Sequence, residues 1–534
     1  MLAPNEELSF FSDAVLQDHL GLLGAKPSQD KTDDVSHAPI VASSVLRRLE
    51  DRSTGTDNDG PASTLQYGLL AGSRQKIHSL KSQTETETET EPQEDEHLYP
   101  VEKEDDDKGK EDDPRLLFNV TAPSSTFICG SQGSGKSHTL SCMLEACLIP
   151  SKLGRLAKPL TGVVFHYDTF ISDTGGSPCE AAYLASSNKV DVRVLCAPTN
   201  VATIKRTYQR LGITVEPLQI DQSHLNTKRM MDLMAVSQGD VPLYMESIKR
   251  ILREMRIVQQ QVGGGFDYKE FKRRVDECDF TPGQLAPLTQ RLDALESFMP
   301  SSQTQTPNTW SKKKKPAVGS GGTDWTPVPG RLTIVDLSCP CVSPETACAL
   351  FNICLGIFLQ EENENIGRVF ALDEAHKYMT TSPEAAIFTE TILSAVRLQR
   401  HLGVRVIVST QEPTISTALL NLCSVTIVHR FTSPEWLKVL RSHLAAASKD
   451  VTVGGRTLCG SEDEESKEIT LFERIIKLGV GEALLFAPSA IVGVRDEGYG
   501  CGDEPVLERL GGNNLAITVR GRLTQDGGRS VLSV

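Results

Sequence analysis

The chain alternates short apolar runs, rich in valine, isoleucine and leucine, with longer stretches whose apolar residues recur at helical spacing. Continuous apolar runs are typical of strands that are buried on both faces of a parallel sheet. The pattern therefore predicts an α/β fold, a mainly parallel sheet with helices on both faces. The predicted strands are 126–129, 161–168, 190–198, 331–338, 369–372, 404–413, 423–431 and 481–488.

Helical spacing is clear in 344–361 and 382–403, which lie between predicted strands. It recurs in 243–260 and 284–299, so we expect residues 201–300 to form a mainly helical insertion in the sheet. The basic residues of this insertion form either a nucleic-acid face or an ordinary solvated helix surface. They are Lys249, Arg250, Arg253, Arg256, Lys269, Lys272, Arg273 and Arg274.

The remaining boundaries follow from composition. Residues 1–115 end in an acidic low-complexity run with few apolar groups, so we expect a mostly disordered acidic N-terminal region. Short segments within it are expected either to be helical or to dock on the core. The two parts of the core are expected at 116–200 and 331–495, with a flexible loop at 301–330 and a C-terminal tail at 496–534.

Charge is concentrated in one place. The 534 residues carry a net charge of −15, but fifteen acidic and three basic residues lie between 83 and 113, which leaves about −3 for the rest. The folded part is therefore near neutral, and charge neither requires nor excludes contact with DNA. The acidic run is either simply solvated or has a regulatory or DNA-mimicking role. Lys312–Lys315 is either a nuclear localisation signal or a phosphate contact.

Cysteine usage and hydropathy indicate the compartment. Thirteen cysteines are scattered without a paired framework, which is typical of buried free thiols in a reducing compartment. Cys339 and Cys341 form a lone C-x-C with no second pair to complete a zinc site. No signal peptide is recognisable, and no apolar run approaches the roughly 20 residues of a membrane span. We expect a soluble intracellular protein, nuclear or cytoplasmic, without membrane contact.

A glycine-rich octapeptide between the predicted strand 126–129 and the predicted helix 137–149 matches the P-loop pattern G-x-x-x-x-G-K-[ST]. The backbone N–H groups of such a loop cradle phosphate, and the helix N-terminus adds a positive dipole. Lys136 is expected to reach the β- and γ-phosphates of ATP, and Ser137 to hold Mg²⁺. A surface turn would leave the apolar flanks unexplained. The octapeptide comprises Gly130, Ser131, Gln132, Gly133, Ser134, Gly135, Lys136 and Ser137.

Two adjacent carboxylates, Asp373 and Glu374, follow the predicted strand 369–372. The carboxyl ends of strands in α/β sheets border the crevice where ligands bind. We expect Asp373 to accept hydrogen bonds from the Mg²⁺ shell and Glu374 to orient and polarise the attacking water. Gln411, at the end of the strand 404–413, is predicted to sense the γ-phosphate; the alternative is a strand-to-loop cap.

A P-loop site is often completed by an arginine from a neighbouring subunit, which neutralises charge that develops on the γ-phosphate. Arg397 and Arg400 precede the strand that carries Gln411 and lie three apart, so on a helix they project to one side. Arg520 and Arg522 lie two apart and share a face if their segment is a strand. Arg400 is the first candidate and Arg522 the second, with ordinary surface charge as the alternative for all four.

Taken in order, these motifs resemble the HerA/FtsK superfamily of P-loop ATPases, and the HerA-like branch in particular. The resemblance covers about 116–495 and rests on GSQGSGKS, TIVDLS, ALDEAHKY, RHLGVRVIVSTQEP, VTIVHRFTSPEW and KLGVGEALLFAPSA. It implies a RecA-like ATPase core that assembles as a homo-hexameric ring and translocates double-stranded DNA. It also implies that Lys136 and Ser137 bind nucleotide and Mg²⁺, that Asp373 is the metal-side acid, Glu374 the catalytic acid and Gln411 the sensor.

The chain departs from that family at two places. HerA proteins open with a small β-barrel domain where this chain has its acidic region, and the helical insertion is larger than the core needs. The letters DEAH also occur in DEAH-box helicases, but those carry a Ser-Ala-Thr motif and an arginine-rich motif that are missing here.

Three functions remain open on the sequence. The first is a ring-forming motor that acts on DNA. The second is an ATPase of the same fold that acts on protein or as a nucleotide-gated assembly switch. The third is a catalytically silent nucleotide-binding scaffold, which the presence of Glu374 disfavours.

Overall fold

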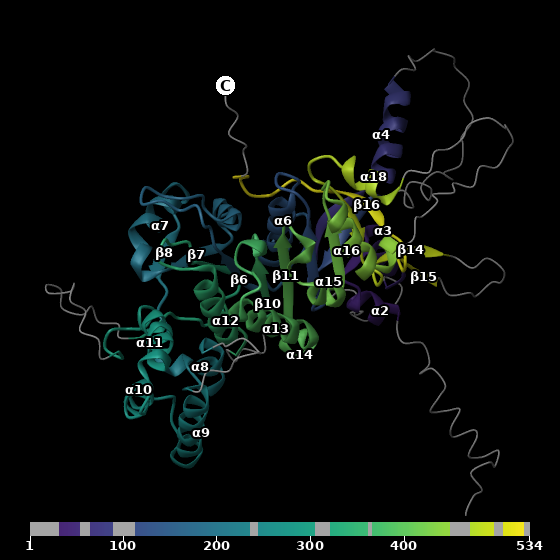
Figure 1. Ribbon diagram of the computed structural model, residues 1–534. Helices are drawn as coiled ribbons and strands as arrows, with labels where there is room; N and C mark the ends of the chain where they lie inside the picture. The colour runs from purple at the N-terminus through teal and green to yellow at the C-terminus, as the bar shows by residue number, and fades with distance from the viewer. Residues whose placement is uncertain are drawn as a thin grey trace, which may run out of the picture.

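The computed structural model of the chain describes residues 31–53, 65–88, 113–234, 244–304, 321–360, 366–448, 470–495 and 506–527. Most of the acidic run, 89–112, and Lys312–Lys315 lie outside these ranges. The named strands join into one sheet, and helices pack on both of its faces (Figure 1). The predicted α/β fold class is thereby confirmed.

One half of the sheet is parallel throughout. Along β6, Val163 and Phe165 join one hydrophobic cluster while Val164 joins the other, so both faces of the strand are buried. This double burial explains the continuous apolar runs of the sequence. In spatial order the parallel strands are β12 (Val425–Val428), β4 (Ser125–Cys129), β11 (Val404–Thr410), β10 (Arg368–Leu372), β6 (Thr161–His166), β9 (Arg331–Asp336), β7 (Asp191–Cys196) and β8 (Thr214–Pro217).

Different helices bury their apolar residues on the two faces. The cluster that contains Val164 includes residues of α3 (Ser43–Ser53), α6 (Lys136–Leu148) and α7 (Val201–Tyr208). The cluster that contains Phe165 includes residues of most of the other helices. These are α8 (Thr227–Leu233), α9 (Tyr244–Val262), α10 (Tyr268–Asp276), α11 (Pro282–Glu296), α12 (Pro344–Gln360), α13 (Pro383–Arg397), α15 (Thr417–Leu422), α16 (Pro434–His443) and α18 (Leu471–Ile476).

The other helices and the 3-10 turns complete the described chain. They are the helices α2 (Lys31–His37), α4 (Arg74–Thr88), α14 (Gln399–Leu402) and α17 (Ala445–Ser448), and the 3-10 turns η2 (Glu180–Ser186), η3 (Pro198–Asn200), η4 (Gln209–Leu211), η5 (Gln222–His224), η6 (Ala375–Lys377) and η7 (Pro413–Ile415). Among the described helices, none is both long enough and apolar enough to cross a membrane.

The other half of the sheet is mostly antiparallel and corrects two predicted boundaries. β2 lies between β3 and β16, so neither the N-terminal region nor the predicted C-terminal tail is wholly outside the core. Of the strands in this half, β13 was predicted at 481–488, whereas local pattern missed the others because each is short and most pair with segments far away in the sequence. In spatial order they are β13 (Glu482–Phe486), β16 (Leu515–Val519), β2 (Tyr67–Ser73), β3 (Arg115–Asn119), β1 (Ile40–Ala42), β14 (Ile491–Arg495) and β15 (Val506–Arg509), with β5 (Gly154–Arg155) paired to β2.

The predicted insertion 201–300 is largely helical, as its spacing indicates, but it is not helical throughout. β8 pairs with β7 and extends the parallel sheet by one edge strand. Figure 1 shows α8, α9, α10 and α11 grouped at the lower left, beyond α12. The insertion in the sheet therefore begins after β8 rather than at residue 201.

Candidate active site

The glycine-rich loop connects β4 to α6 and adopts a conformation that only glycine accepts freely. Gly130, Gly133 and Gly135 have φ values of 151°, 72° and 110°. A Cβ atom at Gly130 would lie 2.7 Å from the Cβ atom of His429. Gly135 is the residue before α6, so Lys136 and Ser137 are the first residues of that helix.

Lys136 is almost completely buried at the start of α6. Its Nζ donates a hydrogen bond to Ser131 O at 3.1 Å. Burial lowers the pKa of Lys136, while the nearby carboxylates of Glu374 and Asp373 act in the opposite direction. The loop is anchored to the end of β12, because Ser131 N and Ser131 Oγ both donate to Arg430 O at 2.8 Å. The lysine and the two acids of the second motif therefore belong to one site.

The two carboxylate oxygens of Asp373 have different surroundings. Oδ2 accepts from His166 Nδ1 at 3.0 Å and from Cys179 Sγ at 3.5 Å, whereas Oδ1 is buried and has no hydrogen-bond partner among the described residues. Burial alone would raise the pKa of Asp373, but the His166 hydrogen bond and charge outweigh it and hold this pKa below its usual range. Burial raises the pKa of the Cys179 thiol to about 12, so the thiol keeps its proton.

These residues fit the Mg²⁺ that the P-loop pattern implies. Mg²⁺ prefers oxygen ligands and keeps several of its waters. Asp373 Oδ1 is a buried oxygen without a partner in the described part of the chain, so it is free to accept from a hydrated cation. Ser137 supplies a hydroxyl oxygen in the first turn of α6, where it is half-buried.

Glu374 has a φ of 49° and is the only non-glycine residue with positive φ among the described residues. Its Oε2 accepts from Gln411 Nε2 at 3.0 Å, and His376 Nε2 lies 3.4 Å away. Gln411 N donates to His376 Nδ1 at 3.4 Å, so the proton of the neutral ring is on Nε2 and points to Glu374. Burial lowers the pKa of His376, which favours this neutral ring. The predicted sensor thus contacts the predicted catalytic acid.

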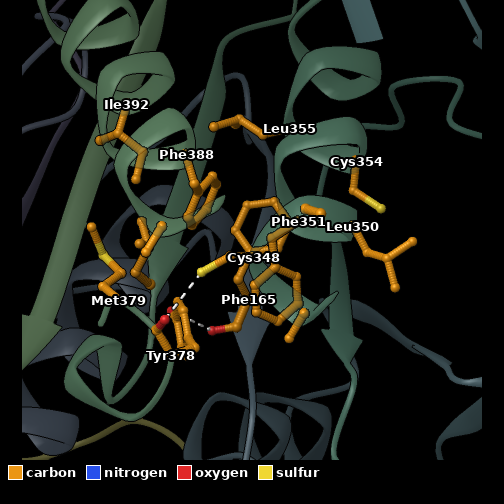
Figure 2. Close-up of a cluster of buried hydrophobic side chains, with 14 of the residues drawn as sticks. Phe165, Cys348, Leu350, Phe351, Cys354, Leu355, Tyr378, Met379, Phe388 and Ile392 are labelled. Atoms are coloured by element: carbon orange, nitrogen blue, oxygen red, sulfur yellow. Dashed lines mark hydrogen bonds between the residues drawn. The ribbon is translucent and has the colours of Figure 1, made fainter. Parts of the chain in front are cut away.

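A cluster of aromatic side chains surrounds Phe165 near the end of β6 (Figure 2). The ring centroids of Phe165 and Phe351 are 5.0 Å apart, and Phe388 meets Phe165 edge-on at 5.9 Å. Tyr378 Oη and Asp373 N both donate to Phe165 O, at 3.4 and 3.0 Å. The end of β6 and the segment after β10 are therefore fixed to each other.

Arg400, the first candidate for the neighbouring-subunit arginine, is exposed in α14, just before β11. It lies at the amino end of that strand, whereas the P-loop lies at the carboxyl end of the adjacent parallel strand β4. The prediction that Arg397 and Arg400 share one helix is wrong. The backbone leaves the helical conformation between them, at Leu398, with a ψ of 9°.

The structure corrects the prediction for Arg522. Both Arg520 and Arg522 lie beyond the end of β16, so they do not share a strand face. The Arg522 side chain is only 2% exposed, and its Nη1 lies 3.2 Å from Glu180 Oε2. A guanidinium that is buried and paired within its own subunit cannot reach a nucleotide on another.

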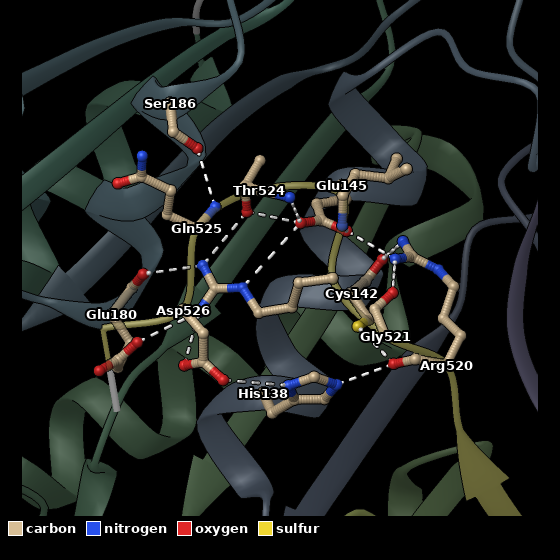
Figure 3. Close-up of polar contacts among 12 residues, drawn as sticks. His138, Cys142, Glu145, Glu180, Ser186, Arg520, Gly521, Thr524, Gln525 and Asp526 are labelled. Atoms are coloured by element: carbon tan, nitrogen blue, oxygen red, sulfur yellow. Dashed lines mark hydrogen bonds and ion pairs between the residues drawn. The ribbon is translucent and has the colours of Figure 1, made fainter. Parts of the chain in front are cut away.

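Both arginines lie near the buried Glu145 of α6, at 2.7 Å for Arg520 and 4.0 Å for Arg522, and Figure 3 shows the polar network around it. Glu145, which is fully buried in α6, accepts from Thr524 N and Thr524 Oγ1 at 3.0 and 2.6 Å. It also accepts from Leu523 N at 3.0 Å and from Arg520 Nη1 at 2.7 Å. We call residues 520–526 the C-terminal strap, since they run across the helix that begins at the P-loop.

Sequence reasoning missed several residues of this site. His166 gave a signal, because it is a polar residue at the carboxyl end of a predicted strand. His376 follows the two acids directly. The sequence gave no signal for Cys179 or Glu145, because nothing near them in the sequence indicates which residues they contact.

No family model and no curated protein matches the chain. Among solved structures, VirB4 of Thermoanaerobacter pseudethanolicus is 12% identical, with a TM-score of 0.41 over 76% of this chain and 91% of that one. The plasmid coupling protein TrwB is 12% identical, with a TM-score of 0.37 over 76% and 88%. The genome packaging NTPase B204 of Sulfolobus turreted icosahedral virus 2 is 8% identical, with a TM-score of 0.27 over 68% and 92%.

Likenesses this distant carry no argument about the ligand, substrate or assembly of this chain. The chain's own features do: a mainly parallel sheet, a P-loop between β4 and α6, and two acids after β10 beside a polar residue after β11. On these grounds we assign the chain to the RecA-like P-loop NTPase fold, with the HerA/FtsK superfamily as the one its motifs resemble.

Proposed function

We propose that the chain is a Mg²⁺-dependent ATPase of the HerA-like type that works as a homo-hexameric ring and translocates double-stranded DNA. The observation that supports the ATPase proposal most is that the P-loop lies beside the two acids that follow β10. Lys136 lies within electrostatic reach of Asp373 and Glu374, and Glu374 accepts a hydrogen bond from Gln411. A nucleotide-binding scaffold has no need of a carboxylate held in this way.

The contacts within the site support a role in ATP hydrolysis for each of its residues. The backbone N–H groups of the P-loop and the ammonium of Lys136 bind the phosphates. Ser137 and Asp373 hold Mg²⁺, which, when bound, neutralises charge on the β- and γ-phosphates. Glu374 orients the attacking water and accepts its proton, and Gln411 and His376 keep that carboxylate in place. The hydrophobic cluster around Phe165 supports the backbone of Asp373, because Asp373 N donates to Phe165 O.

The ring and the DNA substrate rest on the motif resemblance and on exposed positive charge. Arg250, Arg253 and Arg256 lie on α9 and are exposed, and no ion pair to them occurs among the described residues. Such a row suits a phosphate backbone. Arg400 is the proposed neighbouring-subunit arginine, since it is exposed and too far around the sheet to serve its own P-loop.

The test of the ATPase proposal is steady-state ATP hydrolysis by the full chain, with and without Mg²⁺. Glu374→Gln keeps the shape of the side chain but is a poor base, so turnover should fall about 100-fold or more while ATP binding persists. Glu390→Gln is the matched control, because Glu390 is an exposed carboxylate on α13. Hydrolysis by Glu374→Gln at the wild-type rate would show that the water is activated elsewhere.

A further inference from the structure

Asp373 is held by one of its two carboxylate oxygens only. Oδ2 accepts from His166 Nδ1 at 3.0 Å and from Cys179 Sγ at 3.5 Å, while Oδ1 has no partner among the described residues. The side chain of Asp373 is only 3% exposed. One oxygen of this carboxylate accepts two hydrogen bonds, and the other is buried without any from the described residues. This difference indicates that the rotation of the carboxylate about its terminal bond is fixed.

His166 is placed for this contact by the register of the sheet. It is the last residue of β6, and the preceding pair in the register is Phe165 with Leu372, so His166 lies level with Asp373 on the neighbouring strand. On its other side it is level with Asp336 of β9. A carboxylate without a proton can only accept, so Nδ1 is the ring nitrogen that carries hydrogen towards Asp373.

Cys179 is placed by a separate chain of hydrogen bonds. Its backbone N donates to Tyr208 Oη at 3.0 Å, and Tyr208 Oη donates to Asp336 Oδ2 at 2.7 Å. Asp336 Oδ1 accepts in turn from Ser338 N at 3.0 Å. The thiol therefore reaches Asp373 from a rigid and fully buried support.

The donor atoms of His166, Cys179 and Asp373 all lie within 4.8 Å of one another, which also suits a transition-metal ion. The hydrogen bonds favour a different reading. The hydrogens of the imidazole Nδ1 and of the thiol are both directed at the same carboxylate oxygen, so these two donors and Asp373 Oδ2 already satisfy one another. The atoms of the three groups that stay buried without a hydrogen-bond partner among the described residues are Asp373 Oδ1 and His166 Nε2.

We propose that His166, assisted by Cys179, is a positioning residue that fixes the rotation of the Asp373 carboxylate and so keeps Oδ1 directed at the Mg²⁺ shell. This inference rests on the proposed function. The terminal torsion of an aspartate is broad and roughly two-fold, so an unheld carboxylate samples other orientations. When a side chain that hydrogen-bonds to a metal ligand is removed, metal affinity or activity falls by about 10-fold to 100-fold.

The test compares two substitutions of His166 in the full chain. His166→Leu has a similar volume and no donor. His166→Asn places its amide N–H close to the position of Nδ1 and can still donate to Oδ2. ATP turnover is measured against free Mg²⁺ at saturating ATP. His166→Leu should raise the Mg²⁺ concentration for half-maximal turnover about 10-fold, and His166→Asn should recover most of that shift.

The inference is overturned if His166→Leu has the Mg²⁺ dependence of the wild type, or if His166→Asn and His166→Leu shift it equally. Should His166→Leu melt well below the wild type, Cys179→Ala replaces it, and an unchanged Mg²⁺ dependence in that variant overturns the inference. Stoichiometric zinc in the purified chain that is lost in Cys179→Ala would also overturn it. Failure of the ATPase proposal looks different, since the wild type itself would then lack Mg²⁺-dependent turnover.

Discussion

At Glu374 the backbone enters the left-handed region, with a φ of 49°. This conformation costs a non-glycine residue about 1–3 kcal/mol and persists only where the surroundings require it. Here it directs the carboxylate to Gln411 Nε2, 3.0 Å away, and to His376. The strain is therefore explained by the position it gives to the proposed water-activating group.

Removal of the Gln411 amide tests that explanation. Gln411→Ala takes away the donor to Glu374 Oε2, so the carboxylate is held less well, and ATP turnover should fall about 10-fold to 100-fold with little change in ATP affinity. Thr414→Ala, an exposed substitution in the same loop, is the control. Equal turnover of the two variants would mean that Gln411 caps the strand and does not serve the site.

His429 predicts a pH dependence of stability. It is fully buried behind the P-loop, where Nδ1 donates to Glu482 O at 2.9 Å and Nε2 lies 2.9 Å from Thr139 Oγ1. Burial lowers the pKa of His429 to about 4, against about 6.5 in an unfolded chain. The unfolded chain therefore takes up a proton first, and the contribution present above pH 6.5 is lost as the pH falls towards 4.

The measurement is the free energy of unfolding in urea against pH, for the wild type and for His429→Asn. Between pH 7 and pH 4 the wild type should lose about 3 kcal/mol more than the variant, which has no group to titrate at this position. Parallel pH profiles of the two proteins would show that His429 is protonated in the fold as easily as in the unfolded chain.

Contiguous motifs allowed Lys136, Ser137, Asp373 and Glu374 to be predicted, because each motif carries its own strand and helix context. Their meeting with Gln411 was also predictable, since parallel strands end at one edge of the sheet. The contact of Asp373 with Cys179 was not. It depends on the path of the chain after β6 and on a hydrogen bond from Cys179 N to Tyr208 Oη, neither of which leaves a local pattern.

Among the elements, α6 is the one whose surroundings depart most from expectation. The sequence predicts the helix from its apolar spacing and the P-loop before it, but gives no partner for the buried Glu145. That partner is the C-terminal strap, which follows β16. The strap could not be predicted because short polar segments near a terminus resemble unstructured tails, and only the pairing of β16 with β13 and β2 brings it to α6.

The strap makes a prediction about stability. Arg520→Ala removes the shorter of the two ion pairs of the buried Glu145, at 2.7 Å, and leaves the one to Arg522 at 4.0 Å, so it should lower the free energy of unfolding by about 2–3 kcal/mol. Arg397→Ala breaks an exposed pair with Glu390 and should cost about 1 kcal/mol or less. Denaturant titration of both variants measures the difference. If the two lose equal stability, the network of Figure 3 does not hold the P-loop helix.

The described chain is organised around one sheet, and its parallel and antiparallel halves differ in what they carry. The parallel half carries the P-loop and the two acids, and its P-loop strand β4 lies between β12 and β11, which come much later in the chain. The antiparallel half includes β1 and β2 from the region expected to be disordered. β1 pairs with β3 and β14, and β2 pairs with β3, β16 and β5, so no window of local sequence contains these partners.

If the chain forms the proposed ring, each ATP site contains Glu374 from one subunit and Arg400 from its neighbour. Arg400→Ala should leave ATP affinity nearly intact and lower turnover about 1,000-fold, because the missing guanidinium stabilises charge only as the γ-phosphate leaves. Mixing this variant with Glu374→Gln should restore part of the activity, since a mixed ring has some interfaces with both groups. Arg397→Ala is the control. Normal hydrolysis by monomeric Arg400→Ala would rule out a site shared in this way.

The proposal as a whole stands on whether this ATP site drives movement on duplex DNA. Its most direct test is the steady-state rate of ATP hydrolysis by the full chain with and without long double-stranded DNA, at fixed salt because phosphate contacts weaken as salt rises. We predict a Mg²⁺-dependent rate that long duplex DNA raises several-fold and that Glu374→Gln abolishes under both conditions. An ATPase rate that is the same at every DNA concentration would contradict the motor and favour an ATPase that acts on protein or on its own assembly.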